Sequence, residues 1–346
     1  MKERLVCTAS LQCVALLVLS VVRIAYSEEI PAAPPGTFSV IVLPDTQKYT
    51  SDEEQQAYFT AETQWIADNR QSQRIAFVSH VGDIVDVNVP EQWAVAKSAM
   101  DRLHGKVPYG FSVGNHDMQP ANGDSTLFQQ TFPASQFEQF AWYRGEIKNN
   151  TNSFQLFSAG ELQFVILHLE CNAPDDVLNW ANGVLKQHRG RRAIVTTHMY
   201  LGPLEAPQAS EGYYTDPKGR MRWKKCHGNK GNSPEQMWQK CFKKHRHLFL
   251  ILCGDQSRTQ AMRRTVVGDR GNRVYELLSD YRQGYLRVMR FKPQENEIEV
   301  WTYSPYLERL CRGTSIVAEP DEHHFSLDYD MSTQELPVKP ELSATD

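Results

Sequence analysis

The segments Gly82-Asp83-Ile84-Val85-Asp86 and Gly114-Asn115-His116-Asp117 decide the fold class of this 346-residue chain. Each follows a short apolar run, Ile75-Ala76-Phe77-Val78 in the first case and Gly110-Phe111-Ser112-Val113 in the second. Short apolar runs bounded by Gly and polar residues are typical of buried strands. We therefore predict two buried strands that deliver acidic, amide and imidazole groups to one edge of a sheet.

Other apolar runs end in the same way. Polar side chains follow the runs at residues 38–43, 193–197 and 248–253, namely Asp45 and Gln47, His198, and Asp255. Stretches with apolar residues at helical spacing alternate with these runs, which indicates an α/β fold. Ligands of α/β sheets bind at the carboxyl ends of the strands, so five such strand ends predict one functional site.

The N-terminal segment, residues 1–27, has the pattern of a signal peptide. A charged start precedes an apolar core at residues 14–22, and small residues lead up to Ser27. The alternative is a membrane anchor, but Arg23 interrupts an apolar run that is far shorter than the ~20 residues needed to span a bilayer. We expect cleavage near Ser27, export to the periplasm or the medium, and no stable membrane anchor afterwards.

The remaining chain reads as one domain with flanking segments. Residues 28–36 are rich in Pro and Ala and are predicted to form a linker, followed by a domain at residues 37–331. Residues 332–346 are polar, lack periodicity and are predicted to be disordered. An insertion at about residues 201–232 is rich in Gly, Lys and aromatic residues, and such a long segment between two ligand strands suggests a lid.

Two helix starts carry the pattern of a capping box. Ser51 with Glu54 precedes one apolar helical stretch, and Ser233 with Gln236 precedes another. In this motif each side chain satisfies a backbone N–H group at the start of the helix. Both positions are therefore predicted to begin helices.

Cysteine usage predicts an unpaired thiol. Without Cys7 and Cys13 of the signal segment, five of the seven cysteines remain, and an odd number in an exported protein leaves one unpaired. Cys253 lies inside an apolar run and is expected to be that thiol. Cys226 and Cys241 are candidates for a local disulfide, although the sequence leaves equally open that they are unpaired.

Charge sets limits on the partners of the chain. The net charge is −4, with 23% charged residues and 41% hydrophobic residues. This balance provides no basic field for nucleic acid and no polybasic segment for a membrane surface. The sequence therefore gives no clear nucleic-acid surface, and it leaves the oligomeric state open.

The polar strand ends have the composition of a centre for two divalent cations. The carboxylate of Asp83 can bridge two cations, Asn115 offers an amide oxygen, and His198 offers a ring nitrogen. Two cations ~3.5–4 Å apart can clamp a phosphate and generate a hydroxide between them. His116 is placed to protonate a leaving group as a general acid, and we expect Asp117 to orient its imidazole.

At this point the chain resembles the calcineurin-like metallophosphoesterases. The segments at residues 82–86 and 114–117 look like the second and third signature motifs of that family, and the later His198 agrees in order and spacing. The resemblance covers residues from about 38 to 305. It implies a four-layer αββα sandwich with mixed sheets, a two-metal site at the carboxyl strand edges, and hydrolysis of phosphate mono- or diesters.

The resemblance also implies the ligands of each metal. One metal would take Asp45, Gln47 and Asp83, and the other would take Asp83, Asn115, His198 and Asp255. The sequence departs from the family at two motifs. Asp-x-His becomes Asp45-Thr46-Gln47, and Gly-His-x-His becomes Gly254-Asp255-Gln256-Ser257.

These departures replace imidazoles by oxygen ligands, which favours manganese, magnesium or calcium over zinc or iron. Gln47 and Ser257 each lack the imidazole that the first site would use. We therefore expect the second site to be occupied always, and the first at high metal concentration or with substrate bound.

The sequence thus predicts an exported phosphoesterase in which a metal-bound hydroxide attacks a phosphate ester. Arg258, directly after the last motif, is a candidate for a contact to the phosphate, and a surface salt bridge is the alternative. The losses at Gln47 and Ser257 motivate a different function, a phosphate- or metal-binding protein with weak or no catalysis. Hydrolysis of another ester or a pyrophosphate linkage in the cell envelope is a further alternative.

Overall fold

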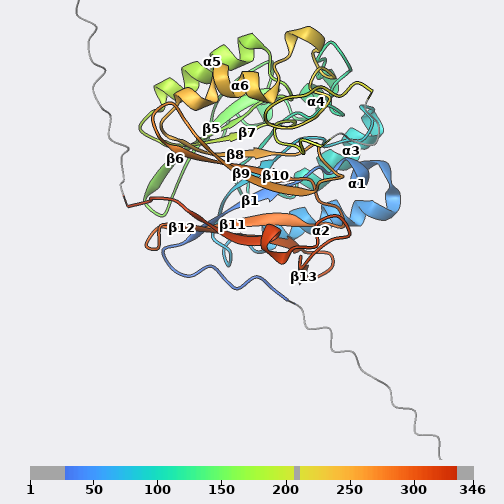
Figure 1. The fold of residues 1–346 in the computed structure, drawn as a ribbon. Helices are drawn as coiled ribbons and strands as arrows, with labels where there is room; N and C mark the ends of the chain where they lie inside the picture. The colour runs from blue at the N-terminus through green and yellow to red at the C-terminus, as the bar shows by residue number, and fades with distance from the viewer. Residues whose placement is uncertain (1–27, 206–210, 333–346) are drawn as a thin grey trace, which may run out of the picture.

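The computed structural model describes residues 28–205 and 211–332 (Figure 1). The predicted signal peptide at residues 1–27, residues 206–210 of the predicted insertion, and residues 333–346 of the predicted tail lie outside the described residues. Among the helices that the structure describes, none combines the length and the apolar character needed to cross a membrane.

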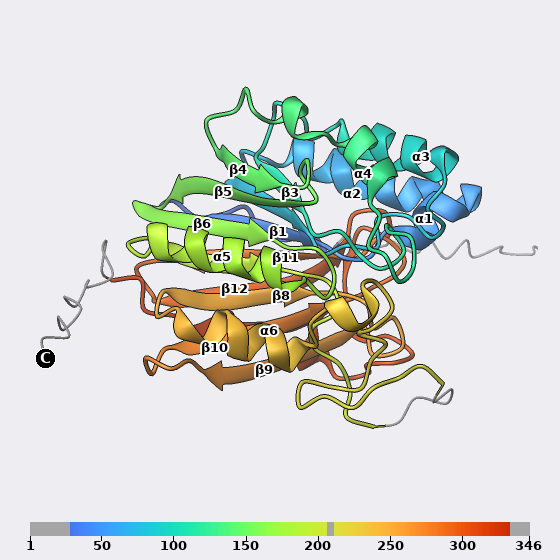
Figure 2. The same ribbon diagram turned by 90° about the horizontal axis from the view of Figure 1, so that it is seen from above.

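Two mixed sheets of seven strands stack face to face, and helices cover both outer faces (Figure 1). In Figure 2 the helices α5 and α6 lie over one sheet, while α1 to α4 gather to one side, next to the strands of the other. The arrangement confirms the expected four-layer αββα sandwich with mixed sheets.

The first sheet combines strands from both ends of the chain, in the order β13-β12-β11-β1-β2-β3, with β14 paired to β12. Its strands β1, β2 and β3 are parallel, and β11 runs antiparallel to β1. The strands are β1 (Phe38–Leu43), β2 (Ile75–His80), β3 (Tyr109–Phe111), β11 (Leu286–Lys292), β12 (Glu297–Ser304), β13 (Arg309–Leu310) and β14 (His324–Asp328).

The second sheet uses the middle of the chain, in the order β4-β5-β6-β7-β8-β10-β9. The central run β6-β7-β8-β10 consists of parallel strands. Antiparallel strands flank this run, since β5 pairs with β6 and β9 pairs with β10. The strands are β4 (Tyr143–Ile147), β5 (Asn152–Ala159), β6 (Leu162–His168), β7 (Arg192–Thr196), β8 (Leu248–Cys253), β9 (Ala261–Val267) and β10 (Arg273–Ser279).

Within the described residues, six α-helices form the outer layers. Helix α5 is strongly amphipathic, with Val177, Ala181 and Val184 on the buried side at a spacing of three to four residues. The helices are α1 (Gln47–Ser51), α2 (Gln56–Asp68), α3 (Pro90–Met100), α4 (Thr126–Thr131), α5 (Asp175–Gln187) and α6 (Pro234–Lys240).

Three apolar layers hold these elements together. One lies between the two sheets and contains Val40 of β1 and Ile166 of β6, among others. A second lies between the first sheet and α2, α3 and α4, and a third between the second sheet and helices α5 and α6. Adjacent residues of β1 face different layers, as Val40 and Ile41 do, because successive side chains of a strand point to opposite faces.

The structure corrects one of the two predicted helix starts. Ser51 is the last residue of α1, and Asp52 instead caps the following turn by accepting a hydrogen bond from the backbone N–H of Glu54. Ser233 and Gln236 do form the predicted capping box at the start of α6, with both reciprocal hydrogen bonds.

The predicted linker at residues 28–36 lies against the domain. Ile30 and Ala33 are buried, and the backbone N–H of Ala33 donates to the carbonyl of Ser72. The domain thus packs residues that precede the boundary expected at residue 37.

The candidate disulfide between Cys226 and Cys241 is wrong. All five cysteines of the described residues are free thiols. Cys226 packs in the apolar layer of the first sheet, together with Cys171, whereas Cys241 follows α6 in the layer outside the second sheet. Cys253, expected to be unpaired, is a buried free thiol on β8.

Candidate metal centre

The polar groups predicted from the strand ends lie at one edge of the sandwich. Strands β1, β2 and β3 of the first sheet lead to Asp45, Asp83 and Asn115, and strands β7 and β8 of the second lead to His198 and Asp255. Each follows its strand within two to four residues, so parallel strands bring them to a common edge.

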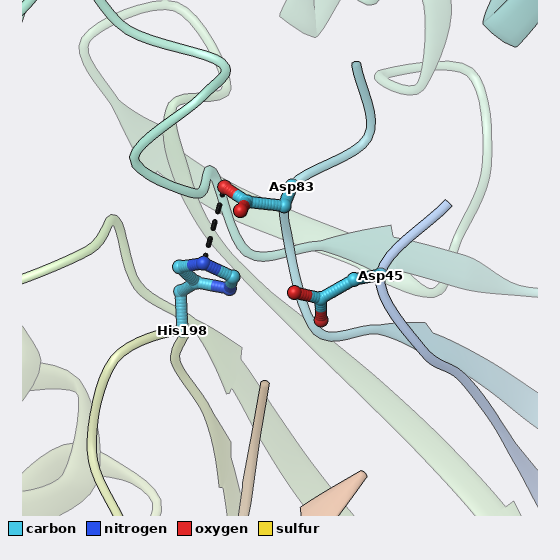
Figure 3. Close-up of side chains that lie close together, drawn as sticks. All are labelled: Asp45, Asp83 and His198. Carbon is cyan, nitrogen blue, oxygen red and sulfur yellow. Dashed lines mark ion pairs between the residues drawn. The ribbon is translucent and has the colours of Figure 1, made fainter. Parts of the chain in front are cut away.

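Three of these side chains converge closely. Asp45, Asp83 and His198 each offer a ligand atom, and these atoms lie within 4.8 Å of one another (Figure 3). The Nε2 atom of His198 is 3.1 Å from Oδ1 of Asp83 and 3.8 Å from Oδ1 of Asp255. All three converging residues are buried, so their charges interact with little screening by water.

The tautomer of His198 is fixed by the backbone. Its Nδ1 atom lies 2.9 Å from the carbonyl oxygen of Val81, and a carbonyl can only accept a hydrogen bond. Nδ1 therefore carries the proton and donates it, which leaves Nε2 directed at the carboxylates. Metal-binding histidines are commonly held by such a contact on the other ring nitrogen.

The backbone is strained where the carboxylates enter the site. Asp83 has φ of 47° and Asp255 has φ of 73°, which are uncommon for residues other than Gly. Gly114 allows the second and third motifs to approach, because a Cβ atom there would lie 2.2 Å from the backbone nitrogen of Asp83. Such strain persists at sites where the surrounding fold holds it in place.

The remaining predicted ligands complete a connected network. Gln47 donates from Nε2 to Oδ2 of Asp83 at 3.3 Å. In the amide orientation that satisfies both of its ends, Asn115 donates to Oδ1 of Asp255 at 2.6 Å, and its oxygen accepts from the backbone N–H of His116 at 3.2 Å. The structure thus brings together all six residues predicted to bind metal, and their role as ligands stays a prediction.

Burial and mutual repulsion disturb the charges of the site. Burial, reinforced by neighbouring carboxylates, raises the pKa of Asp255 to about 7 and that of Asp45 well above its ordinary value. Burial also opposes ionisation of Asp83, but the charge and hydrogen bond of His198 outweigh it and lower the pKa of Asp83 to about 2. Burial disfavours the charge of His198, yet the surrounding carboxylates raise its pKa well above the ordinary value.

This arrangement fits divalent cations. Oδ1 of Asp45 is buried and has no hydrogen-bond partner among the described residues, although Oδ2 accepts from the backbone N–H of Asp255. A buried carboxylate oxygen without a partner is costly, and a cation would satisfy it. The donors are mainly oxygen atoms with one imidazole nitrogen, a set suited to hard cations.

His116 is oriented by Asp86 and not by Asp117. The Nδ1 atom of His116 lies 2.6 Å from the carbonyl oxygen of Asp86 and 3.8 Å from its Oδ1 atom. The carboxylate of Asp117 instead accepts from the backbone N–H groups of Val85 and Gly114, at 3.0 and 2.7 Å. Asp117 therefore ties the second motif to the third, and the expected contact to the imidazole is wrong.

Arg258 lies at the rim of the site. It is exposed in the turn after Asp255, and within the described part of the chain it makes no hydrogen bond and no ion pair. The structure leaves its guanidinium in solvent near the strand edge, so a contact to substrate stays a prediction.

Two further charged residues reach the site, and the sequence interpretation did not include them. Asp280 directly follows β10 and is buried, and its charge adds to the effect of burial in raising the pKa of Asp45. Its position after an apolar strand is the same signal that identified Asp255. Lys225, from the insertion, lies 2.7 Å from the Asn115 amide oxygen, and no sequence pattern marks it.

Comparison with known proteins was consistent with this geometry. A family model described as calcineurin-like phosphoesterase matches residues 38–230, more than half of the chain. The chain is 29% identical over 324 residues to the uncharacterized protein YvnB of Bacillus subtilis (strain 168). That match covers 89% of this chain but 23% of YvnB, so the chain spans a minor part of the length of this relative.

The fold is also similar to that of a solved phosphatase. The purple acid phosphatase PPD1 from seeds of yellow lupin (Lupinus luteus) matches with a TM-score of 0.54 and 14% identity. The similarity covers 87% of this chain and 56% of the lupin chain. At this identity the likeness concerns the fold alone.

Proposed function

We propose that this chain, which belongs to the calcineurin-like phosphoesterase family, is an exported enzyme that hydrolyses phosphate mono- or diesters with manganese, magnesium or calcium. Family membership makes the chain a metal-dependent hydrolase of phosphoric esters. The buried group of Asp45, Asp83 and His198, with Nε2 of His198 held toward the carboxylates, carries the proposal.

The cations and the residues of the chain would have different roles in hydrolysis. Divalent cations held by the predicted ligands supply Lewis acidity, an activated water and neutralisation of the charge on phosphate. Asp83 would help to hold them, since its Oδ1 atom faces Nε2 of His198 and its Oδ2 atom accepts from Gln47. Asp117 keeps the second and third motifs in register through the N–H groups of Val85 and Gly114.

His116 has the geometry of the general acid. Because the carbonyl of Asp86 accepts from Nδ1 at 2.6 Å, the proton for the leaving group must come from Nε2. After this transfer the imidazole is neutral and keeps its proton on Nδ1, so its contact to Asp86 is preserved. The ring is about one-third exposed, which leaves it accessible to a substrate oxygen.

Two features support the finer parts of the proposal. Gln47 and Asp255 replace imidazoles of the family motifs by side chains that can offer oxygen ligands, and hard cations prefer oxygen. The leader-like pattern of residues 1–27 supports export.

The test is hydrolysis of bis-p-nitrophenyl phosphate and p-nitrophenyl phosphate by the mature protein. The protein would be chelated and then supplied with manganese, magnesium, calcium or zinc, beside His116→Ala and Asp83→Ala. His324→Ala is the matched control, because this histidine is exposed on β14 and pairs with Glu299. Metal-restored activity that both site variants lose would support the proposal, and metal binding without hydrolysis in any condition would contradict it.

A further inference from the structure

The second half of the insertion is fixed against the site and does not form a free lid. The backbone N–H of Ala121 donates to the carbonyl of Lys225 at 2.9 Å, and that of Asn232 donates to the carbonyl of Asn172 at 3.2 Å. These contacts join the insertion to the loops that follow β3 and β6.

The residues after Lys225 secure it further. Cys226 is buried in the apolar layer that also contains Cys171. His227 is buried, and its Nε2 atom lies 3.2 Å from Oε2 of the buried Glu170. The backbone position of Lys225 is therefore set by its own carbonyl and by the residues that follow it.

The side chain of Lys225 points into the metal centre. Its Nζ atom lies 2.7 Å from the Asn115 amide oxygen, in the orientation that also satisfies Asp255. Its positive charge opposes the rise in the pKa of Asp255 that burial causes. Lys225 thus brings a positive charge into contact with Asn115 and within electrostatic reach of Asp255.

The neighbouring basic residues are directed elsewhere. Nζ of Lys224 lies 4.7 Å from the ring centre of Tyr214 and 5.1 Å from that of Trp223. The guanidinium of Arg222 lies 5.5 Å from the ring centre of Tyr213. Lys225 therefore differs from these neighbours in the direction of its side chain and not in its charge. Lys224 provides a matched control.

We propose that Lys225 binds the phosphoryl group of the substrate. The inference rests on the proposed function. An ammonium group has three donors, and the contact to Asn115 occupies one, which leaves two for oxygens of a phosphate at the candidate metal centre. If the amide oxygen of Asn115 turned to a bound cation, the third N–H group of Lys225 would be released as well. Lys225 would thus supply a fixed positive charge in a site that lacks the imidazoles at Gln47 and Ser257.

The experiment compares Lys225→Met, Lys225→Arg and Lys224→Met in the full chain. Calorimetry would measure the dissociation constant of manganese and, for the manganese-loaded protein, that of inorganic phosphate. The kcat and KM for bis-p-nitrophenyl phosphate and the Tm would be measured for each variant. Loss of a charge-assisted hydrogen bond predicts phosphate binding weakened by about 10- to 100-fold in Lys225→Met. Lys225→Arg should recover part of the lost phosphate affinity. Lys224→Met should bind phosphate as tightly as the parent.

Manganese binding and Tm separate this role from a structural one. Lys225→Met should bind manganese at least as tightly as the parent, because removal of a nearby cation cannot weaken the site for metal. Unchanged phosphate affinity in Lys225→Met would overturn the inference, as would an equal loss in Lys224→Met. The phosphate affinity tests the role of Lys225 even if the parent hydrolyses neither ester. Failure of this inference can therefore be distinguished from failure of the proposed function.

Discussion

His198 and Val81 are 117 residues apart in the chain, yet Nδ1 of His198 lies 2.9 Å from the carbonyl oxygen of Val81. His198 follows β7 of the second sheet, and Val81 follows β2 of the first. This hydrogen bond joins the two sheets at the metal centre. The direction of Nε2 therefore depends on how the two sheets are packed.

Asp280 is expected to support metal binding through Asp45. Replacement by Asn keeps its size but removes a buried carboxylate whose charge acts on Asp45. Loss of such a supporting group behind a metal ligand weakens metal binding by roughly 10- to 100-fold. Calorimetric titration of Asp280→Asn with manganese would measure this change. Asp269→Asn, a half-exposed residue between β9 and β10, is the control, and equal affinities in the two variants would refute the role of Asp280.

His116→Ala should lower kcat according to the leaving group. Removal of a general acid costs about 10²- to 10⁴-fold in rate. The loss should be largest for an alkyl or phenyl ester and smallest for p-nitrophenolate, which needs little protonation. Steady-state rates on such a series would show the trend. A loss that is the same for every leaving group would argue that His116 acts by position and not by proton transfer.

Removal of metal should destabilise the protein more at high pH. Burial raises the folded-state pKa of Asp117, Asp255 and Asp280 from 3.8 to about 7. In the metal-free protein these groups bind protons in the folded state, so their contribution is complete below about pH 4 and is lost as pH rises through about 7.

The check is the Tm of chelated and manganese-loaded protein from about pH 5 to about pH 8. The difference in Tm between the two forms should widen as pH rises, because the cation replaces the missing protons. A difference that stays constant or narrows would show that the metal does not offset the charges of these carboxylates.

Glu62 provides a pH dependence that is independent of the metal centre. It is fully buried on α2, neither carboxyl oxygen has a hydrogen-bond partner among the described residues, and burial raises its pKa from 4.5 to about 8. Its contribution to folding is therefore complete below about pH 4.5 and is lost as pH rises through about 8.

Glu62→Gln should remove this dependence. Urea unfolding should give similar free energies for the variant and the parent near pH 5, and a more stable variant near pH 8, by the order of a few kcal/mol. Glu91→Gln, at an exposed position on α3, is the control. Parallel pH profiles for Glu62→Gln and the parent would contradict the assigned protonation.

The central strands and most site residues could be predicted because their signals are local. Apolar runs with polar ends mark β1, β2, β7 and β8, which are buried along their length except at Ala76 of β2. Strand β9 was not predicted, since it is an edge strand with exposed residues at Arg263, Arg264 and Thr265. Short apolar runs reveal the interior of a sheet better than its edges.

Adjacency in sequence misled the interpretation of Asp117. Asp117 follows His116 directly, but its carboxylate is taken up by backbone N–H groups, while Asp86 reaches the imidazole from the second motif. Lys225 could not be found because its role depends on how the insertion packs. Ser51 was misread because the chain is already helical from Gln47.

The first sheet has a consequence for synthesis of the chain. Strand β1 has β2 on one side and β11 on the other, so this sheet unites the earliest and the latest strands. A ribosome-bound chain that has exposed Asp45, Asp83 and Asn115 still lacks the strand that closes β1. Such non-local pairing folds slowly. The domain is therefore expected to complete its fold only after translation has released its C-terminal strands, and a nascent chain lacks the complete candidate metal centre.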